Sequence, residues 1–227
     1  MSGLLLSGKP AFMKFRHAAA LALVAWYVLT PALSWAEGHT VALKTFTAPD
    51  GAFSFRYWDQ LVRCKPPNRG DVWEPADICS AYHPVCDGSL VYEQYGVACF
   101  AYPRNKFTNT PAFEAATFSV EILDTKKTDK SCLTFDPDFE ERTGTKKING
   151  VLFTVFGFVE GGMNQSVDGT AYRAFYKGKC YQLGVNFATF NDDPEDYDPP
   201  IRSLTERDVN EVNSKLEQAL KSFKFLK

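Results

Sequence analysis

The chain has 227 residues, of which 45% are hydrophobic, 15% aromatic and 23% charged, and its formal net charge is −2. The aromatic content excludes an intrinsically disordered chain, and glycines without a period exclude a collagen-like one. A near-neutral charge with no basic block gives no electrostatic footprint for nucleic acid, so we expect no nucleic-acid partner. The length suits one domain.

Residues 1–36 have the layout of a secretory signal peptide. They contain no acidic residue, Lys14 and Arg16 form a basic region, and residues 18–29 are all apolar. Pro31 then breaks the helix, and Ser34-Trp35-Ala36 places small residues where signal peptidases need them. The sequence therefore predicts cleavage after Ala36 and a secreted or periplasmic mature chain of residues 37–227.

The same stretch leaves one alternative open, a retained membrane anchor. Residues 18–36 are uncharged over 19 positions, which is just long enough to cross a bilayer. Pro31 and the small-residue pattern favour cleavage. Loss of the signal leaves 22 of the 25 basic residues against 27 acidic ones, a formal charge of −5. We expect this mature chain not to span a membrane.

Two strands are expected at the start of the mature chain. Residues 41–47 alternate weakly and end at Pro49-Asp50-Gly51, a strong turn signal. Residues 53–57 then alternate aromatic with polar or charged side chains, the pattern of a half-buried strand.

Residues 64–89 form a long loop with several prolines, three cysteines and no periodicity. Long loops in compact domains tend to be functional or disordered, and the apolar side chains in this one disfavour disorder. Trp73, Tyr82 and His83 are its candidate binding residues, because a Cys79–Cys86 disulfide would pre-organise the surface around them. A structural lid over a sheet edge is the alternative.

Strand patterns continue through the middle of the chain. Alternation and apolar runs predict strands within 90–102 and at 118–122, 151–159, 170–176 and 180–190. Asn149-Gly150 and Lys177-Gly178-Lys179 have the composition of tight hairpin turns. The polar stretch 124–147, which follows the strand expected at 118–122 and precedes the Asn149-Gly150 turn, is expected to hold a short helix around 137–142.

The clearest helix lies at the C-terminus. Thr205 and Asp208 resemble a capping box. The apolar residues that follow recur with a helical period and predict one buried stripe: Val209, Val212, Leu216, Leu220 and Phe223. The whole pattern predicts an α+β domain, mainly a single antiparallel β-sheet flanked by helices, with this amphipathic helix packed on one face and disulfides stabilising it.

All six cysteines follow the signal, and an even set in an oxidising compartment indicates disulfides: Cys64, Cys79, Cys86, Cys99, Cys132 and Cys180. The spacing favours a Cys79–Cys86 loop, and we expect Cys132 to pair with Cys180 and Cys64 with Cys99. A zinc site of Cys64, Cys79, His83 and Cys86 is the alternative. Loose spacing and the oxidising compartment disfavour it.

The two ends of the mature chain resemble PsbP-like domains. Residues 46–57 match the opening strand, turn and strand of that family, and residues 216–225, with Ser222-Phe223-Lys224, match its final helix and strand. The chain departs from the family at Trp58-Asp59-Gln60-Leu61 and in its cysteine-rich middle. The resemblance implies an antiparallel sheet flanked by helices, in extracytoplasmic modules that bind protein partners or ions, generally without catalysis.

The mature chain has only His39 and His83, and it lacks the serine-nucleophile and phosphate-loop motifs. We therefore expect an exported, non-catalytic accessory domain without a cofactor that binds a protein or small ligand. The alternative is a secreted hydrolase with an unrecognised carboxylate site.

The sequence offers two further candidate sites, and each has a simpler structural alternative. The acidic segment that follows residue 190 offers oxygen ligands to calcium, but it lacks the glycine and spaced glutamate of an EF-hand, so a solvated turn is expected. Its acids are Asp192, Asp193, Glu195, Asp196 and Asp198. An aromatic groove for an apolar or sugar ligand is the second, against core packing. Its residues would be Trp73, Tyr92, Tyr95 and Tyr102.

Overall fold

The computed structural model describes residues 42–64, 94–107, 110, 112–138, 140–162, 165–190 and 202–226. The chain divides into two units, Met1–His39 and Thr40–Lys227, and every described residue belongs to the second. The predicted signal peptide and most of the cysteine-rich loop lie outside the described residues. Both remain predictions.

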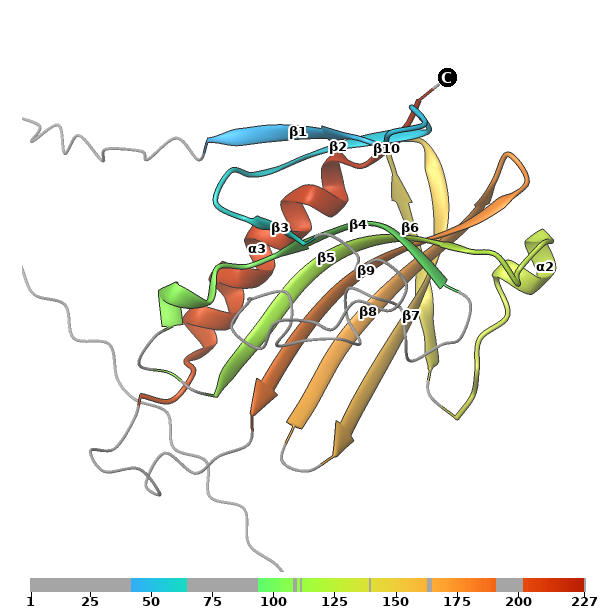
Figure 1. Ribbon diagram of the computed structural model, residues 1–227. Helices are drawn as coiled ribbons and strands as arrows, with labels where there is room; N and C mark the ends of the chain where they lie inside the picture. Colours follow the sequence, from blue (N-terminus) through green and yellow to red (C-terminus); the bar gives the residue numbers. More distant parts are fainter. Residues whose placement is uncertain are drawn as a thin grey trace, which may run out of the picture. The chain divides into compact units, whose positions relative to one another are not determined.

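Most of the described chain forms a seven-stranded sheet in the order β3-β4-β5-β9-β8-β7-β6 (Figure 1). All neighbouring strands in it are antiparallel. Its strands are β3 (Val62–Cys64), β4 (Gln94–Ala101), β5 (Phe113–Leu123), β6 (Glu141–Ile148), β7 (Val151–Gly162), β8 (Gln165–Tyr176) and β9 (Lys179–Phe190). The expectation of a mainly antiparallel β-sheet is confirmed.

A second, three-stranded sheet has the order β1-β2-β10. It consists of β1 (Leu43–Thr47), β2 (Phe53–Trp58) and the short β10 (Lys224–Phe225). The described helices are η1 (Arg104–Phe107), a 3₁₀ turn, and the α-helices α2 (Asp129–Cys132) and α3 (Glu206–Ser222). The prediction of a single sheet is therefore wrong, because β2 pairs with the chain's last strand instead of joining the larger sheet.

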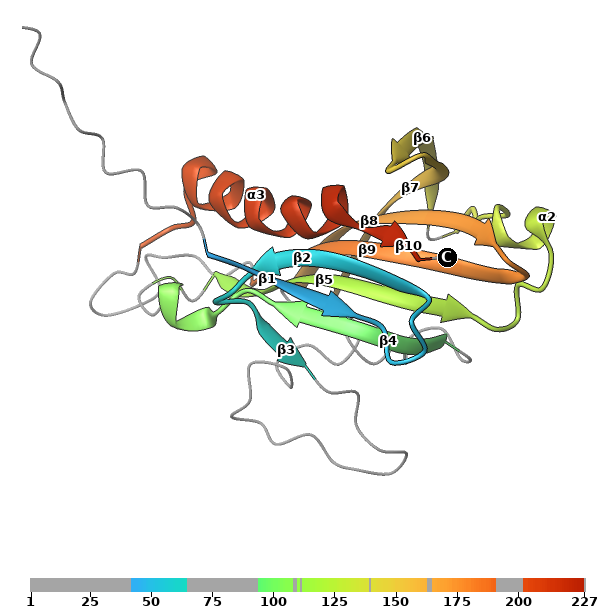
Figure 2. The ribbon, with the colours of Figure 1, turned by 90° about the horizontal axis from the view of Figure 1, so that it is seen from above.

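One hydrophobic core unites the two sheets with α3. Phe53 and Phe55 from β2 contact Phe118 and Phe223 at ring-centroid distances of 4.9–5.2 Å. Val212, Leu216, Ala219 and Leu220 of α3 are fully buried in this same core. Figure 2 shows α3 beside the small sheet, and its contacts are mainly with β2, followed by β5 and β9.

Local sequence signals explain where the elements begin and turn. Thr205 caps α3 through a capping box with Asp208, as predicted. The β6–β7 and β8–β9 hairpins turn at the predicted places, where Asn149, Gly150, Lys177 and Gly178 have positive φ. Two-residue hairpin turns need this conformation, which asparagine and glycine adopt at low cost.

The region 124–147 differs from its prediction. The described helix in it is α2 at Asp129–Cys132, and the sequence from Glu141 onward forms β6. Thr128 and Ser131 form a capping box that starts α2. The expected helix around 137–142 is wrong, because the polar residues of β6 alternate along an edge strand and pair with β7.

Candidate functional site

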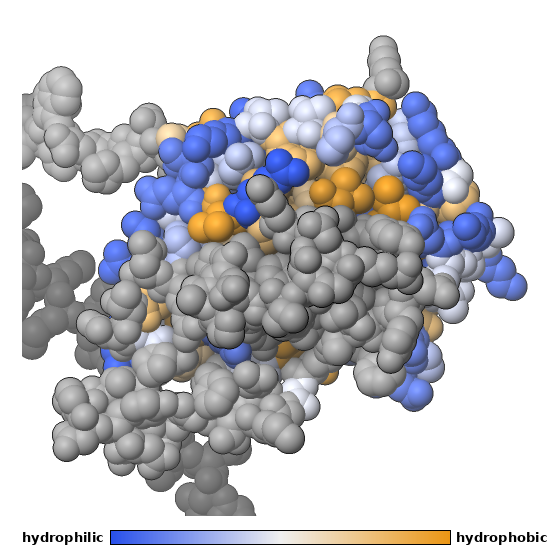
Figure 3. Space-filling model, in the orientation of Figure 1, coloured by the Kyte–Doolittle hydropathy of each residue, from blue (hydrophilic) through white to orange (hydrophobic). Residues whose placement is uncertain are grey.

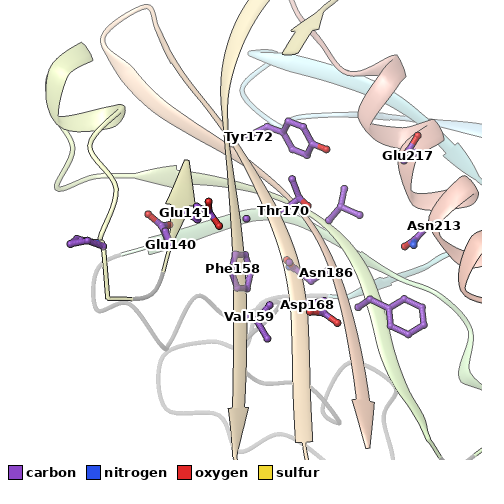
Figure 4. Close-up of a pocket in the computed structure, with 15 residues that line it drawn as sticks. Glu140, Glu141, Phe158, Val159, Asp168, Thr170, Tyr172, Asn186, Asn213 and Glu217 are labelled. Carbon is purple, nitrogen blue, oxygen red and sulfur yellow. The ribbon is translucent and has the colours of Figure 1, made fainter. Parts of the chain in front are cut away.

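A cleft of about 590 Å³ lies between α3 and strands β7–β9 of the large sheet (Figure 4). The cleft is lined by apolar, amide, hydroxyl and carboxylate side chains and by two glycines: Pro137, Glu140, Glu141, Gly157, Phe158, Val159, Asp168, Gly169, Thr170, Tyr172, Val185, Asn186, Phe187, Asn213 and Glu217. We call it the acidic cleft.

The turn of hairpin β6–β7 is hydrogen-bonded to the C-terminal end of α3. The Nδ2 of Asn149, in the turn, donates to the main-chain oxygens of Lys221 (3.0 Å) and Phe223 (2.6 Å). These carbonyls at the C-terminal end of α3 lack helical partners of their own. The turn therefore fixes the distance between α3 and the sheet.

Alternation along the strands decides which side chains face the cleft. Thr170 and Tyr172 lie on the same face of β8 as Ala174, which belongs to the core beneath α3. In Figure 4, Asn213 and Glu217 project from α3 toward these two residues. Val159, which is 69% exposed, adds an apolar rim on β7.

All charged side chains that line the cleft are acidic. The lining contains four carboxylates and no lysine, arginine or histidine. Glu140 is held by Arg173 and Glu217 by Lys221. Glu141 and Asp168 form no ion pair with any described residue. Their charges are therefore available to a ligand.

The pKa of Tyr172 reflects the acidic lining of the cleft. Burial raises the pKa of its phenol above the ordinary value, and the neighbouring charge of Glu217 raises it further. The ammonium of Lys146 lies 5.3 Å from the centroid of the Tyr172 ring, within cation–π range. The wall of the cleft thus already accommodates one cation on an aromatic face.

A buried polar network lies on the face of β8 opposite to Thr170 and Tyr172, and through Arg173 it reaches Glu140 in the lining of the cleft. The Ser119 hydroxyl and the Gln182 Nε2 each donate to Glu121 at 3.1 Å, and Arg173 Nε donates to Gln182 Oε1 at 2.7 Å. Arg173 also binds the Glu140 carboxylate through Nη1 (2.9 Å) and Nη2. Burial raises the pKa of Glu121 to about 7, against the lowering effect of Ser119, Gln182 and Arg173. Glu121 is 7% exposed and lies outside the cleft lining.

Figure 3 views the molecule from the side on which α3 lies behind the large sheet. In the coloured part of this view, hydrophobic residues form a band in the upper half, and hydrophilic residues border it. The acidic cleft lies on the far side, beside α3.

The binding residues expected from the sequence are not among those lining the cleft. Trp73, Tyr82 and His83 lie outside the described residues, as do Cys79, Cys86, Tyr92 and the acids of 192–198. Tyr102 is 1% exposed and donates to Glu211 at 3.4 Å. Burial and the Glu211 charge raise its pKa to about 12. It is a core residue and does not line an open groove.

The cysteine expectations are met in part. Cys132 and Cys180 form the predicted disulfide, which joins α2 to β9. Cys64 and Cys99 lie opposite each other on β3 and β4, and both are disulfide-bonded. With Cys79 and Cys86 outside the described residues, the pairing of these four stays a prediction. Over the described part of the chain, no group of three or more His, Cys, Asp or Glu residues is placed to hold a metal ion.

None of the residues that line the cleft is among the site residues predicted from the sequence. Its members are spread from Pro137 to Glu217 and meet only after the sheet has formed. One signal was present: Asp168 and Thr170 interrupt a strand at positions whose alternation assigns them to the core side. Polar residues at strand positions that should face the core indicate either a cleft at that place or a wrongly assigned strand register.

No protein-family model matches the chain, and no curated protein sequence matches it either. Among solved structures, the Ran-binding protein Mog1p of Saccharomyces cerevisiae is similar, with 10% identity and a TM-score of 0.40 over 82% of this chain and 96% of that one. A PsbP from Synechocystis sp. PCC 6803 (CyanoP) is similar with 10% identity and a TM-score of 0.33, over 86% and 99%.

Within the described ranges, no helix has both the length and the apolar character needed to cross a membrane.

Proposed function

We propose that this protein is an exported, non-catalytic binding domain and that its acidic cleft binds a cationic group of a protein partner or small ligand. The observation that carries the proposal is the lining of the cleft, in which four carboxylates and no basic side chain stand beside aromatic and apolar walls.

Cleft size and chemistry support a cationic ligand. A volume of about 590 Å³ falls in the range of small-molecule sites and leaves room for a lysine or arginine side chain or a small amine. Charge-assisted hydrogen bonds to Glu141 and Asp168 would recognise the charge. Phe187, Val185 and Val159 would cover the alkyl part of such a group.

The disulfide supports the proposed compartment. Disulfides such as Cys132–Cys180 persist in oxidising environments outside the cytosol. This agrees with the predicted signal peptide of residues 1–36 and with a secreted or periplasmic location.

Calorimetric titration tests the proposal. The purified protein is titrated with a lysine-rich peptide, with spermidine and, as reference, with a glutamate-rich peptide. We expect the cationic ligands to bind and the acidic one not to bind, with affinity falling as salt rises. The double variant Glu141→Gln/Asp168→Asn should weaken binding roughly tenfold, because each exposed ion pair contributes modestly.

Asp124→Asn is the matched control, because Asp124 is an exposed acid outside the cleft lining. It should bind as the unmodified protein does. Equal weakening by Asp124→Asn would show that only net charge matters and would overturn the cleft assignment. Glycoside or ester turnover that Glu141→Gln or Asp168→Asn abolishes would establish the hydrolase alternative instead.

A further inference from the structure

A second hollow lies on the other flank of α3, where the helix meets β2. It has a volume of about 360 Å³ and is lined by Arg56 of β2 and by Ser214, Lys215, Gln218, Lys221 and Ser222 of α3. We call it the basic groove, because it has three cationic side chains and no carboxylate in its lining.

Helix geometry separates the basic groove from the acidic cleft. Positions 214, 215, 221 and 222 are each three or four residues from position 218, so the five positions line one side of α3. Asn213 and Glu217 line the other side and belong to the acidic cleft. The buried stripe of Leu216, Ala219 and Leu220 runs between them into the core.

Arg56 is anchored beside the helix by main-chain hydrogen bonds. Its N–H donates to Ser222 Oγ at 2.8 Å, and Ser222 Oγ lies 2.9 Å from the Arg56 carbonyl oxygen. These bonds fix the backbone of β2 against α3. The Arg56 side chain therefore extends from an anchored backbone. Its guanidinium group is exposed and makes no ion pair with a described residue.

The donors of the groove are cationic or amide groups. The Ser214 hydroxyl donates to the Glu211 carbonyl at 2.7 Å, and the Ser222 hydroxyl has main-chain acceptors of its own, so neither hydroxyl proton is available to a ligand. Lys215 lies 5.2 Å above the centroid of the Trp58 ring, which restricts its position. Lys221 shares its charge with Glu217. Three cations and one partnering carboxylate complement a ligand of charge −2.

We propose that the basic groove binds a doubly charged oxyanion, phosphate or sulfate, either free or as an ester. Arg56 would bind two oxygens through its planar fork, and Lys215 and Gln218 would donate to the remaining oxygens. This site takes a ligand of opposite charge to the one proposed for the acidic cleft, and the Glu217–Lys221 ion pair joins the two linings.

Two-dimensional NMR of the ¹⁵N-labelled protein tests the proposal. Inorganic phosphate, sulfate and glycerol phosphate are each titrated at constant ionic strength, with chloride as the reference anion. We expect saturable shifts of the Arg56 Nε–H, the Gln218 amide group and the Trp58 indole N–H. Tighter binding of glycerol phosphate than of inorganic phosphate would assign the site to an ester, and the reverse order to the free ion.

Arg56→Gln should weaken binding at least about tenfold, since it removes a charge-assisted, two-point contact. Arg56→Lys should have an intermediate effect, because lysine keeps the charge without the fork. Lys127→Gln, which removes an exposed lysine outside the groove, is the control and should change nothing. An unchanged amide spectrum verifies that each variant is folded.

Shifts spread equally over exposed lysines, or an Arg56→Gln variant that binds phosphate as well as the unmodified protein, would overturn the basic groove as a site. Neither result would affect the peptide titrations of the acidic cleft, because those measure cation binding on the other flank of α3.

Discussion

Burial governs the ionisation of Glu121. The carboxyl group lies in the polar network of β5, β8 and β9, and its pKa of about 7 compares with an ordinary value of 4.5. Ser119 and Gln182 donate to it and favour the charged form, but the loss of water outweighs these hydrogen bonds. A carboxyl group that keeps its proton up to neutral pH couples folding to pH.

The sign of this coupling gives a prediction. Between pH 4.5 and 7 the unfolded chain has lost the Glu121 proton while the folded chain still holds it, so stability falls as pH rises. The shift corresponds to roughly 3 kcal/mol at 1.36 kcal/mol per unit. Glu121→Gln should remove this fall, leaving the variant at least as stable as the unmodified protein at pH 8.

Urea unfolding at several pH values measures this dependence of the free energy of unfolding on pH. Glutamine preserves both contacts, because its carbonyl accepts from Gln182 and its amide donates to the Ser119 hydroxyl. Glu141→Gln, at an exposed carboxylate, is the control and should keep the slope. A flat profile in the unmodified protein between pH 4.5 and 7 would contradict the assignment of this slope to Glu121.

At the scale of elements, α3 begins at a local capping motif and is stabilised by packing against the rest of the fold. The Thr205–Asp208 capping box begins the helix, and hydrogen bonds from Thr205 and Arg202 lower the pKa of Asp208 to about 2. The apolar stripe then buries Leu216 and Leu220 completely. Most of the stability of such a helix comes from packing of this stripe.

Leu216→Ala and Leu220→Ala should therefore each lower the free energy of unfolding by about 2–5 kcal/mol, as truncations in a packed core do. Denaturant unfolding measures the loss. Val209→Ala, at a half-buried position of the same helix, should cost less. Losses below about half a kcal/mol at both leucines would mean that the stripe does not face the core.

At the scale of the whole molecule, a disulfide and an ion pair are among the contacts that attach residues 124–140 to the sheet. Cys132 is bonded to Cys180 of β9, 48 residues away, and Glu140 is bound by Arg173 of β8. Glu140 also lines the acidic cleft, so this attachment positions part of the candidate site. Neither contact is local in sequence.

Removing the disulfide with Cys132→Ser/Cys180→Ser should cost about 2–5 kcal/mol, because the cross-link no longer restricts the unfolded chain. Amide exchange should become faster in residues 124–140, while the β4–β5 pair stays protected. Ser131→Ala, which keeps the disulfide and alters only the cap of α2, should leave exchange in the sheet unchanged. An unaltered free energy of unfolding in the cysteine variant would contradict this prediction.

The sequence by itself determined the features that depend on neighbouring residues. Alternating side chains located most of the strands, Asn149-Gly150 and Lys177-Gly178 located two hairpin turns, and Thr205 with Asp208 located the start of α3. Each of these signals acts within a few residues, through backbone conformation or one turn of helix. The Cys132–Cys180 pairing was also predicted, because Cys180 lies in a strand-like run and was expected to reach a partner from another part of the chain.

Only the tertiary structure decided the sheet to which β2 belongs and where the candidate site lies. β2 pairs with β10, more than 160 residues later, and a strand pattern carries no information about its partner. The acidic cleft and the basic groove collect residues from both sides of α3, and charged residues on a helix give no sign of the strands that will face them. The physical reason is that a binding surface depends on long-range packing, whereas the sequence pattern records only local preference.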